Sequence, residues 1–237
     1  MGDIFNFKQF SVNQAGCAMK VNTDGVLLGA LALQRDAEQI LDIGTGTGVI
    51  ALMLAQRFPN AKVDAVEIDE AAVLTAGENF STSPFAERLR GHHSSFQHHF
   101  TVNSASKYDL IVSNPPFYIR SLQSPGAAKS LAKHADEAFF EELIAHCSVH
   151  LTAEGSIWLI LPPETAELVK LLAKKMSLHL TQVINIQSFA HSTPHRQILT
   201  FKSQQTVIQN QRLILYSEPK LYTDAYKGVL KDFLTIF

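Results

Sequence analysis

A chain of 237 residues with a net charge of −2 is long enough to bury a hydrophobic core without covalent cross-links. Its two cysteines, Cys17 and Cys147, show no pairing pattern, which argues against a disulfide framework and indicates a reducing compartment. No apolar run approaches the roughly 18 residues of a membrane helix, and the first residues lack the apolar core of a signal peptide. The sequence therefore predicts a cytoplasmic protein without a membrane partner.

The charges are distributed unevenly along the chain. Residues 1–90 carry 7 Lys/Arg and 11 Asp/Glu, whereas residues 91–237 carry 13 and 11. Two stretches, Leu110–Ala135 and Leu168–Ser217, contain no acid at all. A basic face of this kind could bind a phosphate backbone. A solvated surface whose acids lie elsewhere explains the pattern equally well.

The first 35 residues precede any regular alternation of strands and helices. Residues 5–12 alternate apolar and polar side chains, which predicts a short extended stretch. An apolar helix is expected over Val26–Leu33, with Thr23 or Asp24 as its N-cap.

From residue 39 onward, apolar runs and helical patterns alternate. Strands are expected at 39–43, 62–67, near 88–92, 108–113 and 156–161, and helices at 48–58, 70–81, 136–150 and 164–176. The runs at 180–189 and 196–201 predict paired strands, 207–215 a further extended run, and 223–235 a terminal amphipathic helix. Such alternation is typical of an α/β protein with a doubly wound, mainly parallel sheet.

A glycine-rich turn joins the strand at 39–43 to the helix that follows it. Asp42 precedes Gly44, Gly46 and Gly48, and glycines at alternate positions allow a sharp turn and close approach of a ligand. Glu67 ends the next strand, where a carboxylate can accept both hydroxyls of a ribose. Without that acid, the loop would read equally well as a tight strand-to-helix turn.

The spacing of the glycines distinguishes between adenosine cofactors. A dinucleotide site favours Gly-x-Gly-x-x-Gly, in which helix N–H groups meet a pyrophosphate. Here Gly44-x-Gly46-x-Gly48 follows an acid that would repel a pyrophosphate but suits an ammonium group. The pattern therefore favours S-adenosylmethionine over NAD, and we expect Asp42 both to meet the ligand and to orient the loop.

A second motif follows the apolar run at 108–113. Two prolines in Asn114-Pro115-Pro116-Phe117 cannot continue a strand, so the chain must leave the sheet at its carboxyl edge, where ligands bind in open α/β sheets. This turn offers an amide, a carbonyl and an aromatic ring, which together can hold a flat ring that bears an amine. The alternative is a strand exit with a buried phenylalanine.

Together, these motifs resemble the signature of class I S-adenosylmethionine-dependent methyltransferases that act on conjugated amines. The segments Phe7–Phe10, Cys17–Val21 and Thr23–Gly25 narrow the likeness to the bacterial tRNA1(Val) (adenine(37)-N6)-methyltransferase family. The resemblance implies a Rossmann-like fold with a seven-stranded, mainly parallel sheet and an antiparallel C-terminal strand. It further implies an N-terminal extension (1–35) packing over the active site of a methyltransferase domain (36–237), a monomer, and a tRNA substrate.

The resemblance also assigns roles to individual residues. The cofactor would be bound by Asp42, Gly44, Thr45, Gly46, Gly48, Glu67, Ile68, Ser95 and Asn114, with Ser95 replacing an aspartate found in many relatives. Catalysis would involve Asn114, Pro115, Pro116 and Phe117. The RNA would contact Lys20, Arg120, Lys129, Lys133 and Arg196. Residues Ile119–His134 are expected to form a mobile lid over the target base.

Other interpretations remain open on the residues alone. The same nitrogen chemistry would serve methylation of an rRNA base or of a protein glutamine amide. A non-catalytic RNA-binding protein on this scaffold is a third possibility, although its glycine loop and Asn114 are intact. His92, His93, His98 and His99 lack the accompanying ligands of a zinc site, so no metal is expected.

Overall fold

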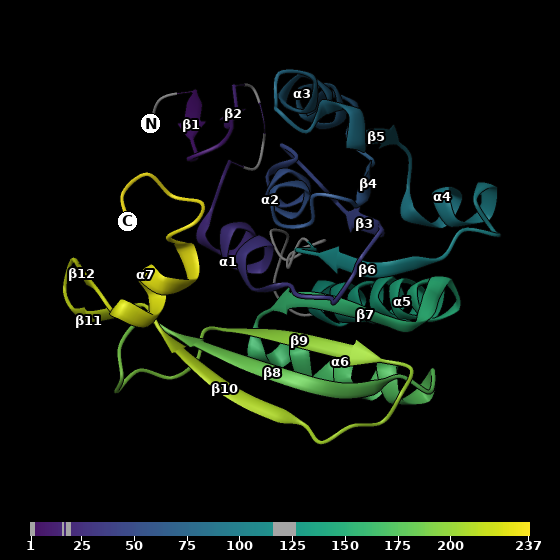
Figure 1. Cartoon of the computed structure of the whole chain (residues 1–237). Coiled ribbons are helices and arrows are strands. Elements are labelled where there is room, and N and C mark those ends of the chain that lie inside the picture. Colours follow the sequence, from purple (N-terminus) through teal and green to yellow (C-terminus); the bar gives the residue numbers. More distant parts are fainter. Residues whose placement is uncertain (1–2, 16, 18–19, 116–126) are drawn as a thin grey trace.

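The computed structural model describes residues 3–15, 17, 20–115 and 127–237, with the backbone alone for 127–136. Its centre is an eight-stranded sheet in the order β10-β8-β9-β7-β6-β3-β4-β5 (Figure 1). Its strands are β3 (Gln39–Ile43), β4 (Lys62–Glu67), β5 (Leu89–His93), β6 (Tyr108–Ser113), β7 (Leu151–Leu161), β8 (His179–Gln187), β9 (Arg196–Lys202) and β10 (Gln209–Ile214). β9 is antiparallel to both of its neighbours, and the other pairings are parallel.

The sheet thus has one strand more than the seven expected. β10 pairs with β8 in parallel register and adds a strand beyond the antiparallel β9. Sequence patterns had suggested an extended run here, but pairing between strands that are distant in the chain is not encoded in local periodicity.

Helices cover both faces of the sheet and create two apolar cores (Figure 1). One core contains α1 (Thr23–Leu31), α2 (Val49–Arg57) and α7 (Asp224–Leu230), with part of α3 (Glu70–Ser81). The other contains α4 (Phe96–Val102), α5 (Ala127–His150) and α6 (Pro163–Lys175). The strands between them are apolar on both faces because helices cover both sides.

Two of these helices differ from expectation at their starts. α1 is capped by Asn22, whose Oδ1 accepts a hydrogen bond from the Gly25 N–H at 2.9 Å, rather than by Thr23 or Asp24. α5 begins at Ala127, so residues 127–134 of the expected lid over Ile119–His134 are helical, and the lid itself stays a prediction. The rest of that lid lies outside the described residues. An Ala- and Lys-rich sequence favours the helix.

Elements at the C-terminal end and in α4 also differ. The terminal helix ends at Leu230 rather than near residue 235, and β7 begins five residues earlier than expected. Sequence analysis missed α4, a seven-residue helix for which Ser95 is the N-cap. Two further small pairs, β11 (Tyr216–Glu218) with β12 (Leu221–Tyr222) and β1 (Ile4–Asn6) with β2 (Ser11–Asn13), are antiparallel hairpins.

The N-terminal hairpin is fixed from two sides. Asn79 of α3 accepts the Asn13 N–H at 2.7 Å and donates to the carbonyls of Asn13 and Thr47, each at 2.9 Å. On the other side, Lys8 donates to the carbonyls of Lys231 and Phe237, and its N–H bonds the Phe233 carbonyl. The two ends of the chain therefore lie side by side (Figure 1). Among the described residues, no helix is long and apolar enough to cross a membrane.

Candidate active site

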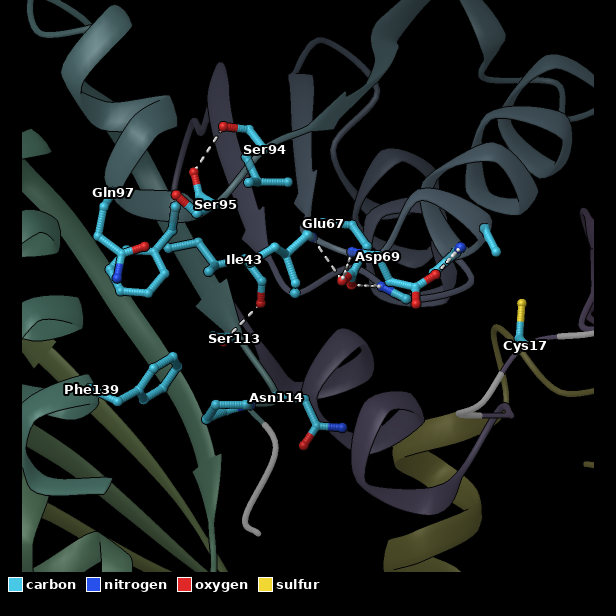
Figure 2. A pocket seen from close by; sticks show the side chains of 18 residues that line it. Cys17, Ile43, Glu67, Asp69, Ser94, Ser95, Gln97, Ser113, Asn114 and Phe139 are labelled. Atoms are coloured by element: carbon cyan, nitrogen blue, oxygen red, sulfur yellow. Dashed lines mark hydrogen bonds between the residues drawn. The ribbon is translucent and has the colours of Figure 1, made fainter. Parts of the chain in front are cut away.

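A cavity of about 440 Å³ opens at the carboxyl ends of β3, β4 and β6, the edge where ligands bind in doubly wound sheets (Figure 2). Its volume falls within the range of small-molecule sites. The lining residues are Cys17, Ile43, Gly44, Gly46, Val66, Glu67, Ile68, Asp69, Ala71, Ala72, Ser94, Ser95, Phe96, Gln97, Ser113, Asn114, Pro115 and Phe139. Six of the expected cofactor residues are therefore brought together.

The three glycines of the loop have different structural roles. Gly44 and Gly46 have φ values of +73° and +56°, and a Cβ at either would meet no atom within 4 Å, so a ligand can approach the backbone closely. Gly48 does not line the cavity. A Cβ there would lie 2.4 Å from Cε1 of Phe80, so this glycine allows α2 to pack against α3.

Glu67 links the glycine loop to the end of β4. Its Oε2 accepts the Gly46 N–H at 2.9 Å, and its Oε1 accepts the N–H groups of Ile68 and Asp69 at 2.8 and 3.0 Å (Figure 2). These bonds hold the carboxylate at the cavity wall. Both lone pairs of Oε1 are used by these bonds, whereas Oε2 keeps one that can accept a hydroxyl group of a bound ligand.

Asp42 lies beneath the loop, fully buried, and is not among the described residues that line the cavity. Its Oδ2 accepts a hydrogen bond from the Thr45 hydroxyl at 2.6 Å, which supports the loop-orienting role. Burial raises the pKa of this carboxyl to about 7, although the Thr45 bond opposes the shift. Its Oδ1 makes no hydrogen bond to any described residue.

The far end of the cavity is built mainly by α4 and α5. Ser95 lines it, but its Oγ accepts the His98 N–H at 3.2 Å as the cap of α4. Phe96 and Phe139 meet edge to face, with centroids 5.6 Å apart, and add an apolar wall. Gln97 is held by its bond to Glu142 at 2.8 Å. Sequence analysis missed these aromatic and amide groups because no local pattern brings α5 to this edge.

Asn114 follows β6 at the opposite side of the opening (Figure 2). The preceding Ser113 is anchored by a 2.8 Å bond from its hydroxyl to the Ile43 carbonyl, which ties β6 to β3 at the cavity floor. The Asn114 Oδ1 is buried, and no described residue donates a hydrogen bond to it. A buried amide oxygen without a donor is costly and rare, and the acceptor role expected of Asn114 stays a prediction.

Several predicted residues lie elsewhere or cannot be placed. Pro116, Phe117 and Arg120 lie outside the described residues, and only the backbone of Lys129 and Lys133 is described, on α5. Lys20 is exposed just before α1. Arg196, at the start of β9, pairs with Asp24 of α1 through a 2.6 Å contact from Nε to Oδ2. Its role in RNA contact stays a prediction.

Two of the four histidines, His92 and His99, belong to a polar network with Asp64 and Tyr108, and neither lines the cavity. His92 Nε2 lies 2.6 Å from Oδ1 of Asp64, and His99 Nε2 lies 3.0 Å from the Tyr108 hydroxyl. Burial would raise the pKa of Asp64, but the His92 hydrogen bond and charge hold it below its usual value. In the part of the chain that the structure describes, no three His, Cys, Asp or Glu residues are grouped as metal ligands would be.

Two features define a Rossmann-like methyltransferase: the strand order, with the antiparallel β9 inserted between β7 and β8, and a cavity at the switch between β3 and β6. A predicted O-methyltransferase from Agrobacterium tumefaciens has the same fold, with a TM-score of 0.68, 17% identity, and coverage of 89% of this chain and 96% of that one. At that identity the likeness concerns the fold alone.

Sequence comparison identifies the family. Residues 22–185 match the family described as Methyltransferase small domain. A tRNA1(Val) (adenine(37)-N6)-methyltransferase of Pedobacter heparinus is 47% identical over 237 residues, the full length of both chains. One from Bacteroides thetaiotaomicron is 40% identical, over 97% of this chain and 96% of its own. The chain belongs to the bacterial tRNA1(Val) (adenine(37)-N6)-methyltransferase family.

Proposed function

We propose that this enzyme methylates N6 of adenine 37, next to the anticodon of a tRNA1(Val), with S-adenosylmethionine as the methyl donor. Full-length relatives that carry this name support the reaction and the RNA. The observation in this chain that carries the proposal is the buried Oδ1 of Asn114 at the cavity edge, to which no described residue donates a hydrogen bond. It is the acceptor that an exocyclic amine requires.

The described residues fit the cofactor. The open backbone at Gly44 and Gly46 leaves room for its amino-acid part, and the remaining lone pair of Glu67 Oε2 suits a ribose hydroxyl. Phe96 and Phe139 offer an apolar wall for a flat base. Ser95 would bind the adenine of the cofactor less strongly than an aspartate would, because its Oγ already accepts the His98 N–H. When bound, S-adenosylmethionine supplies an electron-poor methyl group.

The chain's own contribution to the chemistry is to make the amine nucleophilic and to place it. The lone pair of an aromatic amine is delocalised into its ring. Two acceptors at its hydrogens, Asn114 Oδ1 and the Pro115 carbonyl, favour the pyramidal form in which that lone pair is available. No strong general base is needed, since the methylated amine loses a proton readily. Positioning of this kind contributes roughly 7–11 kcal/mol, and Phe117 would stack on the base.

The remaining parts of the proposal concern the surroundings of the site. An N-terminal extension (1–35) would cover the cavity, and the presence of Cys17 in the cavity wall supports this. The basic residues Lys20, Arg120, Lys129, Lys133 and Arg196 would meet RNA phosphates. The enzyme would act on its tRNA substrate in the cytoplasm, as a monomer.

The test separates catalysis from binding at Asn114. We expect Asn114→Ala to lower kcat by roughly 10²–10³, the loss that follows removal of one pre-organised polar contact from a transition state. Its affinity for S-adenosylmethionine should stay within a few-fold of wild type. The measurement is single-turnover transfer of a labelled methyl group to saturating tRNA, followed by identification of the labelled nucleoside.

Asn60→Ala, a change at an exposed turn residue, is the matched control and should leave the rate unchanged. A near-wild-type rate in Asn114→Ala would mean that residues 114–117 only lead the chain out of the sheet and take no part in catalysis. If the labelled methyl group were found on a glutamine side chain or on another base, the substrate assignment would be wrong but the methyltransferase activity would stand.

A further inference from the structure

A row of aromatic rings lies outside the cavity on the C-terminal part of the sheet. Phe189 and His191 stack with centroids 5.6 Å apart and planes at 8°. The row continues from Phe189 to Tyr216 at 5.8 Å and from Tyr216 to Tyr222 at 4.9 Å. We call these four residues the aromatic edge. His191 is exposed and the other three are partly exposed.

The inner part of this row has a structural explanation and the outer part does not. Tyr216 and Tyr222 pack against the larger apolar core. Phe189, in contrast, belongs to neither apolar core of the described residues, and its ring contacts are with His191 and Tyr216. A partly exposed phenylalanine that stacks on an exposed histidine and lies outside both cores is not explained by core packing.

The sheet topology places the aromatic edge on the same side as Asn114. β9 runs antiparallel to β7, so the loop 188–195 before it lies at the carboxyl ends of β6 and β7. β10 runs parallel to β8, so Tyr216, which follows it, lies at that end too. Figure 1 shows β11, β12 and α7 at the end of the sheet where β6 finishes.

The loop that carries Phe189 is held rigidly. The Ser192 hydroxyl accepts the Phe189 N–H at 2.9 Å and donates to the Phe189 carbonyl at 2.8 Å. The His195 N–H bonds the Ile186 carbonyl at 3.0 Å, and the Tyr216 N–H bonds the Ser188 carbonyl at 2.9 Å. The rings are therefore ordered before a partner arrives, which reduces the entropic cost of binding.

The charges around the aromatic edge indicate the chemistry of that partner. The stretch Leu168–Ser217, which carries Phe189, His191 and Tyr216, contains no acid. The β11–β12 hairpin carries an exposed Lys220 beside an exposed Glu218, and α7 begins with the exposed Asp224. Arg196 lies at the same edge, paired with Asp24. Flat rings beside cations suit unpaired nucleotides, whose bases stack on aromatic side chains while their phosphates meet positive charge.

We infer that the aromatic edge stacks an unpaired base of the RNA loop that carries the target adenine, with Phe189 and His191 as its outer face. The inference rests on the proposed RNA substrate. It adds a second contact with a base, outside the cavity, so that one nucleotide of the loop is stacked on the protein while another enters the site.

The experiment combines a protein change with an RNA change. Phe189→Leu keeps an apolar side chain but removes the ring, and Phe189→Tyr restores a ring. The RNA is the anticodon hairpin, intact or with one abasic nucleotide at each loop position other than the target. Hairpin affinity is measured by fluorescence polarisation, and S-adenosylmethionine affinity by calorimetry.

We expect Phe189→Leu to weaken hairpin binding by about 5- to 150-fold, Phe189→Tyr to restore it, and S-adenosylmethionine binding to remain unchanged. At one loop position, the abasic change should weaken wild-type binding but have no further effect on Phe189→Leu. Equal hairpin affinity of Phe189→Leu and wild type, or additive losses at every position, would overturn the inference. The proposed function fails separately, if the wild-type enzyme transfers no methyl group to the hairpin or to tRNA.

Discussion

At the scale of single residues, two side-chain acceptors of the site, on Glu67 and Asn114, differ in their hydrogen bonds. Glu67 is bound by three backbone N–H groups, whereas Asn114 Oδ1 accepts none from the described residues. The first arrangement fixes an acceptor at the cavity wall before a ligand binds. The second leaves an acceptor unsatisfied until one does. This contrast is consistent with a group that binds the cofactor and a group that acts on the substrate.

Asp42 leads to a prediction about pH. Its pKa is raised to about 7 by burial, so between pH 4 and 7 the folded protein holds a proton that the unfolded chain has lost. The free energy of unfolding should therefore fall as pH rises through that range. Asp42→Asn removes this dependence, and between pH 5 and 8 the variant should gain about 3 kcal/mol relative to wild type.

Thermal melts at several pH values measure this effect. For a chain of this size, 1 kcal/mol corresponds to roughly 2–4 °C in Tm. The exposed Glu87→Gln is the control and should follow the wild type at every pH. A difference in Tm between Asp42→Asn and wild type that stays constant from pH 5 to 8 would contradict an elevated pKa.

At the scale of elements, the close packing of α1 on α2 depends on Gly29. A Cβ at this position would lie 2.9 Å from Sδ and 3.0 Å from Cβ of Met53, and the latter cannot rotate away. We expect Gly29→Ala to destabilise the protein by roughly 1–3 kcal/mol, as overpacking does. Since α1 carries Asp24, the partner of Arg196, the change should also disturb the start of β9.

Gly77→Ala supplies the comparison. It lies on the exposed side of α3, where a Cβ would meet no atom within 4 Å. Helix propensity alone should then stabilise that variant by up to about 1 kcal/mol. Urea unfolding measures the change in the free energy of unfolding for both variants, which should fall for Gly29→Ala and rise for Gly77→Ala. An unchanged free energy of unfolding in Gly29→Ala would show that α1 and α2 can move apart without cost.

The parallel strands and the glycine loop could be predicted from sequence because each is encoded locally. Burial on both faces explains why Ile40 and Leu41 of β3 and residues 110–112 of β6 are apolar, and glycine is favoured at the positive φ of Gly44 and Gly46. Phe139 and Gln97 could not be predicted as cavity residues, since the packing of α4 and α5 places them there. α4 itself is too short, and too rich in His and Gln, to show a helical period.

At the scale of the whole molecule, RNA binding must come from charge placement, because the net charge is only −2. Lys20 and Lys220 are exposed at the end of the sheet that carries the site, whereas Lys174 and Lys175 end α6 at the other end. We expect Lys20→Ala with Lys220→Ala to reduce the slope of log affinity against log salt by roughly 1–2 units. Lys174→Ala with Lys175→Ala should leave the slope unchanged.

Titrations of tRNA over a range of salt concentrations give both slopes. If the α6 pair lowered the slope as much as the other pair, the RNA would lie across a different face. If wild-type affinity did not depend on salt at all, phosphate contacts would not contribute.

During synthesis, the N-terminal hairpin is made long before the C-terminal residues that it contacts. β1 and β2 emerge from the ribosome first, yet Phe7 pairs with Leu234, and Lys8 bonds residues 231–237, more than 200 positions later. At 5–20 residues per second, roughly 10–45 s separate the two events. Until then the hairpin has its contacts with α3 and Phe85 but lacks those with residues 231–237. We therefore expect nascent chains to acquire cofactor affinity late, only after residues 231–237 have left the exit tunnel.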